Sequence, residues 1–212
     1  MRNKKQISLI VIAMSLLVIL VIIITLIVKS NTSSRNSALN GYCLPEYVDV
    51  ELIDIDGHAR RGEKLEGVND IVIHYVGNPN TTAMANRNYF NNEGTTVSSH
   101  FIVGLEGEII QCVPLDEKSS ASNHRNIDTI SIEVCHEDET GKFNEKTYNS
   151  LVKLTAWLCA AAKLDESHVI RHYDVTGKLC PLYYVEHEDA WNKFKQDVAD
   201  KIPLTKLVSL SD

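Results

Sequence analysis

The sequence predicts an α/β domain with a single central mixed β-sheet flanked by helices, preceded by one N-terminal transmembrane helix. Short β-branched runs alternate with longer segments of helical period, which is the pattern of a sheet covered by helices. Hydrophobic residues make up 44% and charged residues 23% of the 212 residues, as in globular domains. A long uncharged apolar run lies near the N-terminus.

The apolar run covers residues 7–28 and reads ISLIVIAMSLLVILVIIITLIV. As a helix it would extend about 33 Å, enough to cross a hydrocarbon core of about 30 Å. Residues 1–6 carry three basic side chains, so the positive-inside tendency places them in the cytoplasm and the bulk of the chain outside the cell. A cleaved signal peptide is the alternative, but the run is longer than a usual signal region and no small-residue cleavage motif follows it.

Charge separates this N-terminal part from the rest of the chain. The formal net charge is −7, but residues 1–35 carry five basic side chains and no acidic one, which leaves −12 for the remainder. A domain this acidic is not expected to bind nucleic acid, because neutralising phosphates takes clustered Lys and Arg. The Ser- and Asn-rich composition predicts a linker over residues 29–45, followed by a globular domain over residues 46–203 and a tail over residues 204–212.

The elements of the domain follow from their hydrophobic period. The expected strands are residues 70–75, 100–103, 108–113, 128–135 and a short run from Val169. The expected helices are one capped by Thr81 or Thr82 that runs towards Asn91, and residues 145–163 and 188–202. The strand over residues 128–135 alternates, so that Glu133 lies on the face opposite its three aliphatic residues.

Five cysteines are spread over the chain. They are Cys43, Cys112, Cys135, Cys159 and Cys180. Disulfides are permitted outside the cytoplasm, but an odd number cannot all pair within one chain and no C-x-x-C motif occurs. Cys135 and Cys159 lie in apolar stretches and are expected to be buried thiols.

Two histidines and a cysteine have the character of metal ligands. His74 ends one apolar run, His172 follows another, and Cys180 lies eight residues later in a GKLCP loop. Two imidazoles and a thiolate would hold a zinc ion with its fourth position open to water, as in catalytic sites. A strand-end histidine is more often structural, and a lone cysteine is more often a small apolar side chain or half of a disulfide. Spacing alone leaves both interpretations open.

Four segments, taken together, favour the metal-site interpretation. In chain order they are IVIHYVGNP, SSHFIVGLEGEIIQCVPLDE, DTISIEVC and RHYDVTGKLCP. The set resembles the zinc-dependent N-acetylmuramoyl-L-alanine amidases of the type-2 family, relatives of the peptidoglycan recognition proteins and of the phage T7-type lysozyme amidase. The resemblance covers residues 51–202. It implies one Zn²⁺ per domain and hydrolysis of the amide between the lactyl group of N-acetylmuramic acid and L-alanine of the peptidoglycan stem peptide.

The resemblance also implies a role for individual residues. His74, His172 and Cys180 correspond to the zinc ligands. Glu133 corresponds to the catalytic glutamate, a general base for water and then a proton donor to the leaving amine. Lys178 corresponds to a lysine near the metal that would stabilise the oxyanion.

The sequence departs from the family in two places. Residues 121–126 read ASNHRN where other members carry a W-H-A-G-like segment, so the role of His124 does not transfer directly. Many members also carry a tyrosine just before the FIV run, and this chain has none there. His124 and Asn78 remain candidates for substrate binding, and His100 and His136 are expected to be structural.

Two other functions compete with a catalytic one. A non-catalytic peptidoglycan-binding sensor is the first alternative, but such relatives usually lose the zinc cysteine, which Cys180 supplies here. A zinc peptidase is the second, but its expected HxH spacing is absent from the sequence. The sequence therefore predicts an amidase catalytic domain on a single-pass anchor in the cell membrane. This domain would face the cell wall and meet two partners, the lipid bilayer and the peptidoglycan or muropeptide substrate.

Overall fold

A six-stranded mixed sheet forms the centre of the domain in the computed structural model, which describes residues 10–27, 39, 41–55 and 58–208. The strands are β1 (Val48–Val50), β2 (Asp70–Ile73), β3 (Phe101–Val103), β4 (Ile109–Gln111), β5 (Thr129–Val134) and β6 (Val169–Arg171). Their order in the sheet is β1-β4-β3-β5-β2-β6. Neighbours are parallel except β3 and β4, which form the expected antiparallel hairpin. The predicted fold class is confirmed.

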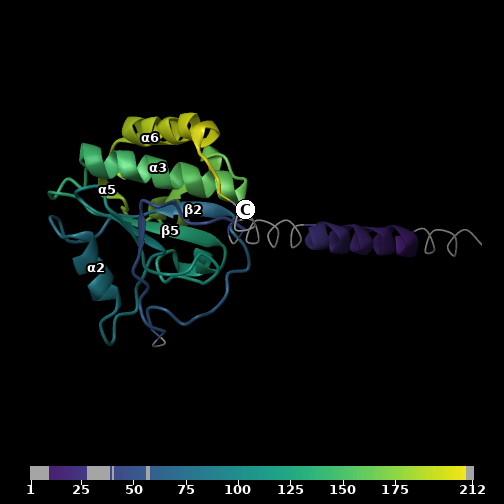
Figure 1. Ribbon diagram of the computed structural model, residues 1–212. Coiled ribbons are helices and arrows are strands. Elements are labelled where there is room, and N and C mark those ends of the chain that lie inside the picture. Colours follow the sequence, from purple (N-terminus) through teal and green to yellow (C-terminus); the bar gives the residue numbers. More distant parts are fainter. Residues whose placement is uncertain (1–9, 28–38, 40, 56–57, 209–212) are drawn as a thin grey trace, which may run out of the picture.

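Helices cover both faces of this sheet. The α-helices of the domain are α2 (Ala83–Phe90), α3 (Glu145–Ala162), α4 (His172–Thr176), α5 (Leu182–Glu186) and α6 (Glu188–Lys201). Short 3₁₀ helices are η1 (Asn123–Ile127), η2 (Glu166–His168) and η3 (Ile202–Leu204). Figure 1 shows α3 and α6 stacked on one face and α2 on the other. The buried apolar side chains accordingly divide into a large cluster under α3 and α6 and a smaller one under α2.

All three expected helices form, and two of them, α2 and α3, begin at a side-chain cap. The Thr82 hydroxyl accepts from the Ala85 N–H at the start of α2, and the Asn144 side chain accepts from the Thr147 N–H at the start of α3. Helix α3 ends at Lys163, whose φ of 58° is left-handed. These caps satisfy backbone groups that the helices themselves leave unpaired.

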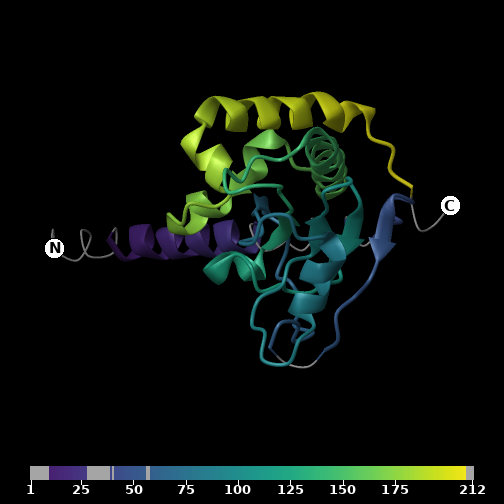
Figure 2. The same ribbon diagram turned by 90° about the vertical axis from the view of Figure 1, so that its left-hand side faces the viewer.

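The chain enters and leaves the domain at one place. The backbone N–H of Cys43 donates to the carbonyl of Val208 over 2.8 Å, which joins the segment before β1 to the segment after η3. Figure 2 shows these two segments approaching each other at one side of the domain. All five cysteines are free thiols, and Cys135 and Cys159 are buried as expected.

A separate helix occupies the predicted membrane segment. Ile10–Ile27 is helical, is long and apolar enough to cross a membrane, and buries none of its residues. The ends of the predicted span 7–28 lie outside the described residues. So do residues 1–6, most of the predicted linker and the last four residues of the tail.

Candidate active site

Strand order brings three candidate residues to one edge of the sheet. His74 directly follows β2, His172 directly follows β6, and Glu133 lies near the end of β5. Strand β2 pairs with β5 on one side and with β6 on the other, and both pairings are parallel. The carboxyl ends of parallel neighbours meet at the same edge, where ligand sites of such sheets usually form.

The three predicted metal ligands form a compact buried cluster. One ligand atom each from His74, His172 and Cys180 lies within 4.8 Å of the others. The Cys180 Sγ atom is 3.9 Å from His74 Nδ1, and the two imidazole centroids are 4.6 Å apart. The structure thus brings together residues that lie on three separate segments of the chain.

The donor set suits zinc. Two imidazole nitrogens and one sulfur are the borderline-soft ligands that zinc prefers, and three protein ligands leave one tetrahedral position open. Donors about 2.0–2.3 Å from a tetrahedral ion lie about 3.3–3.6 Å apart. The cluster is slightly wider than this, so small side-chain movements would close it on a single ion.

Burial sets the protonation state of the cluster. Burial, followed by the neighbouring His172, holds the pKa of His74 well below its usual 6.5. Burial, followed by the charge of Lys178, also lowers the pKa of His172. Both imidazoles are therefore neutral at pH 7, which is the form that binds metal.

The thiol of the cluster is protonated in the metal-free protein. Burial raises the pKa of Cys180 to about 12, although a hydrogen bond from the Tyr75 backbone N–H opposes the rise. A metal ion must therefore displace a proton from this sulfur when it binds.

Glu133 lies beside this cluster and lines the same cavity as the three ligand side chains. Its Oε2 atom is fully enclosed and has no hydrogen-bond partner among the residues that the structure describes. Desolvation raises the pKa of this carboxyl from 4.5 to about 8, and the positive charge of Lys178 partly offsets the rise. An enclosed carboxyl without a partner is free to accept and return a proton, the requirement for a general base.

The cavity is a groove of about 880 Å³ along the carboxyl edge of the sheet. Six of the seven predicted site residues line it, namely His74, His124, Glu133, His172, Lys178 and Cys180. Asn78 is exposed and is not among the lining residues. His100 and His136 also lie outside the lining and bond to backbone carbonyls, as expected of structural histidines.

Several groove residues were not predicted from the sequence. They include Arg61, Glu63, Tyr75, Lys118 and Asn123. Lys118 and Glu63 form an ion pair of 3.2 Å at the rim. Surface-type charged residues have no hydrophobic period, so only the fold reveals that they face the groove.

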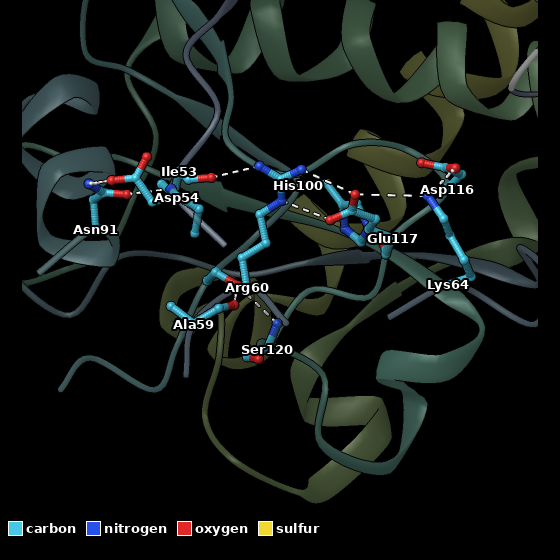
Figure 3. Close-up of polar contacts among 11 residues, drawn as sticks. Ile53, Asp54, Ala59, Arg60, Lys64, Asn91, His100, Asp116, Glu117 and Ser120 are labelled. Atoms are coloured by element: carbon cyan, nitrogen blue, oxygen red, sulfur yellow. Dashed lines mark hydrogen bonds and ion pairs between the residues drawn. The ribbon is translucent and has the colours of Figure 1, made fainter. Parts of the chain in front are cut away.

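A buried ion pair lies beneath the segment that forms one wall of the groove. The Arg60 guanidinium donates to both carboxylate oxygens of Glu117, at 2.7 and 3.1 Å, and to the carbonyl of Ile53 at 2.7 Å. Figure 3 shows Arg60 reaching from this carbonyl to the carboxylate. The Nε2–H of His100 donates to the backbone carbonyl of Glu117 over 2.8 Å. These bonds fix the start of the segment whose next residues line the groove.

A second charged group holds the segment that carries His172. The Arg171 guanidinium is buried, pairs with Asp174 at 2.9 Å and with Glu188 at 2.7 Å, and donates to the carbonyl of Tyr184. The Asp174 carboxylate also accepts the backbone N–H of Arg171 and so caps α4. The first residue of this capped helix is His172, so the cap holds its backbone in place.

Comparisons with known proteins agree with this architecture. A family model described as N-acetylmuramoyl-L-alanine amidase matches residues 64–182, more than half of the chain. The amidase CwlL of Bacillus licheniformis is 30% identical over 74% of this chain and 48% of its own length. The amidase BlyA of Bacillus subtilis (strain 168) is 31% identical over 71% and 46%. The chain thus spans about half the length of the curated relatives it matches.

Solved structures share the fold over nearly their whole length. The catalytic domain of XlyA is 26% identical, with a TM-score of 0.62 over 71% of this chain and 98% of that chain. PlyL has a TM-score of 0.63 over 71% of this chain and 96% of its own, at 24% identity. On the match of the family model, the chain belongs to the N-acetylmuramoyl-L-alanine amidase family.

Proposed function

We propose that the protein is a zinc-dependent cell-wall hydrolase that cleaves the amide between the lactyl group of N-acetylmuramic acid and L-alanine of the stem peptide. The observation that carries this proposal is the buried cluster of His74, His172 and Cys180 with the unpartnered carboxyl of Glu133 in the same groove. The family match supports the reaction class.

His74, His172 and Cys180 would hold the zinc ion. When bound, the ion supplies a Lewis acid that polarises the amide carbonyl and makes water a stronger nucleophile. The three side chains come from the ends of two strands and from the loop after α4, so the fold holds them before the ion arrives. Such a prepared site reduces the ordering that binding would otherwise require.

Glu133 moves the proton. Its carboxylate accepts a proton from the attacking water and then donates it to the amide nitrogen as the C–N bond breaks. The lack of another partner leaves Oε2 available for both transfers. The pKa of about 8 in the metal-free protein would fall near a bound dication, which favours the carboxylate form needed for the first transfer.

Lys178 stabilises negative charge. It lines the groove beside the cluster, and its charge lowers the pKa of both Glu133 and His172. A cation at this place would stabilise the oxygen that becomes negative as the carbonyl carbon turns tetrahedral. His124, in the groove lining, and Asn78, on the exposed turn after β2, are proposed as contacts for more distant parts of the substrate.

The apolar helix gives the enzyme its place in the cell. We propose that it is an uncleaved anchor over residues 7–28, with residues 1–6 in the cytoplasm and the catalytic domain, residues 46–203, facing the wall. The preceding segment, residues 29–45, would act as the linker. A flexible chain of this length, 17 residues, reaches about 20–25 Å, so the target is peptidoglycan close to the membrane. Recovery of the domain mainly in the released, soluble fraction of cells would contradict the anchor.

The test is hydrolysis by full-length protein in detergent, incubated with muropeptides of known structure and followed by mass spectrometry. The expected products are a peptide with an N-terminal L-alanine and a muramic acid with a free lactyl carboxylate. A metal chelator and, separately, Glu133→Gln should each remove them. Muropeptide that is bound but unchanged would point instead to a sensor, and cleavage inside the peptide would point to a peptidase.

A further inference from the structure

Two adjacent residues, Ser122 and Asn123, each contact one histidine of the cluster. We propose that they are positioning residues, which turn the two imidazoles so that both Nδ1 atoms face the metal. The inference rests on the zinc site of the proposed function. It assigns the orientation of the ligands to a segment in which this chain lacks the family's usual W-H-A-G-like residues.

Both hydrogen bonds are made at the Nε2 nitrogen of the ring. Nε2 of His74 lies 3.2 Å from Ser122 Oγ, and Nε2 of His172 lies 2.8 Å from Asn123 Oδ1. An amide oxygen only accepts, so the Nε2 of His172 carries the hydrogen and its Nδ1 is left with a lone pair. For His74 the opposite nitrogen, Nδ1, is the atom 3.9 Å from Cys180 Sγ. His74 therefore presents Nδ1 to the cluster, and the hydrogen bond at Nε2 leaves Nδ1 of His172 as its nitrogen with a lone pair for a metal.

The segment that carries these two residues is held in an unusual conformation. Asn123 has a φ of 55°, in the left-handed region that asparagine tolerates better than most residues. The Asn126 side chain accepts the backbone N–H groups of Ala121 and Ser122, at 3.1 and 2.6 Å. This conformation is thus fixed by the neighbouring Asn126, which holds the backbone of the segment in place.

The same segment also contacts β2, the strand that leads into His74. Arg125 pairs with Asp128 at 2.8 Å and with Asp70, the first residue of β2. Thr129, the first residue of β5, donates its hydroxyl to the Arg125 carbonyl over 2.7 Å. Through these contacts the segment is attached to the start of β2 and of β5. The side-chain oxygen atoms of Ser122 and Asn123 are therefore held at fixed positions relative to the histidine rings that they contact.

Substitution of Asn123 separates orientation from mere packing. Asn123→Gly permits the same backbone conformation and removes the acceptor. Loss of such an outer partner typically costs 10–100-fold in metal affinity, and we expect a loss in this range. Asn123→Asp keeps an acceptor at the same position and tolerates the same φ, so it should bind zinc at least as tightly as the wild type. Ser122→Ala should weaken binding by about tenfold, the lower end of the same range.

Asn80 offers a matched control. It is an exposed asparagine with a φ of 58°, and it is not among the groove residues. Asn80→Gly makes the same chemical change at the same backbone conformation. Its zinc affinity should equal that of the wild type.

The experiment measures zinc affinity of the full-length protein in detergent by competition with a chromophoric chelator. Cobalt-substituted protein then reports ligand geometry through its visible and thiolate charge-transfer bands. The Gly variant should bind weakly with altered bands, and the Asp variant should restore both. Wild-type affinity and wild-type bands in Asn123→Gly, or failure of Asn123→Asp to restore them, would overturn the inference.

If the Gly variant does not fold, wild-type affinity in Ser122→Ala overturns it in the same way. Zinc binding by wild-type protein that cuts no muropeptide would contradict the proposed function alone.

Discussion

The Nδ1 atom of His74 and the Sγ atom of Cys180 lie 3.9 Å apart, although 106 positions separate the two residues in the sequence. His74 reaches this point from the end of β2, and Cys180 reaches it from the loop after α4. Neither residue is close to the other through local structure. Their contact depends on the parallel pairing of β2 with β6, the strand that leads into α4.

This contact makes Cys180 the first residue to test. Cys180→Ala should lower the zinc content of purified protein to a small fraction of one equivalent, because two neutral imidazoles alone bind weakly. Cys159→Ala is the matched control, since Cys159 is a buried thiol outside the groove lining. It should cost about 1 kcal/mol of stability and leave zinc content unchanged. Elemental analysis measures the zinc content of both variants. Equal zinc contents would show that Cys180 is not a ligand.

The main strands and helices were predictable because they carry a clear hydrophobic period and recognisable caps. Strand β1 was not predicted, because three residues, VDV, show no period and pair only because β4 lies beside them. Helices α4 and α5 were also missed, since each has five residues. Helix α4 depends on the cap from Asp174 and on the left-handed Gly177 at its end. Neither feature produces a hydrophobic period from which the helix could be predicted.

Only part of the candidate site could be predicted in the same way. His74, Glu133 and His172 follow or lie within apolar strands, so their positions are conspicuous in the sequence. Ser122 and Asn123 lie in a polar segment, and their histidine partners are 48 and 49 positions away. No spacing rule connects such residues, because the strand order of the sheet alone brings them together.

Zinc binding should release about two protons at pH 7. The pKa of Cys180 is raised to about 12 by burial, so its thiol must lose a proton, whereas both imidazoles have lowered pKa values and are already neutral. The second proton comes from Glu133, whose pKa of about 8 in the metal-free protein falls beside the dication. Calorimetric titration in buffers of different ionisation enthalpy measures this number, and Glu133→Gln should reduce it to about one. A release near zero in that variant would mean that the sulfur is already a thiolate, and a release of two or more would mean that an imidazole starts charged.

Glu133→Gln should keep zinc and lose turnover. The amide cannot take a proton from water, so kcat should fall by about 10²–10⁴-fold, the usual contribution of a general base. Zinc content should stay at the wild-type value, because the three ligands are intact. Single-turnover assays on muropeptides test the loss of turnover, and elemental analysis tests the retention of zinc. Zinc loss in this variant would identify the carboxylate as a ligand, and residual wild-type turnover would exclude it as the base.

The buried ion pair beneath the groove should be far more important for stability than its exposed neighbour. Arg60→Met removes both close hydrogen bonds of the buried Glu117 carboxylate and leaves it only the long contact with Lys64 Nζ at 3.9 Å, which should cost about 3–5 kcal/mol. Lys64→Met is the comparison, since the Lys64 ammonium is largely exposed and pairs with Asp116 at 2.7 Å and only at 3.9 Å with Glu117, so its loss is expected to cost at most about 1 kcal/mol. Adding Glu117→Gln to Arg60→Met should recover part of the loss. Denaturant titrations followed by fluorescence of the buried Trp157 and Trp191 measure all three.

The metal-free protein should become less stable as the pH rises from about 4.5 to about 8, through the contribution of Glu133. In this window the folded protein holds a proton on the carboxyl that the unfolded chain has already released, because burial raises the pKa from 4.5 to about 8. The stability lost is at most about 5 kcal/mol at 1.36 kcal/mol per pKa unit. Glu133→Gln removes this dependence. With chelator present, the two proteins should therefore have similar free energies of unfolding at pH 5, and the variant should be the more stable one at pH 8. A difference that does not change between these pH values would show that the carboxyl is ionised at an ordinary pKa in the folded protein.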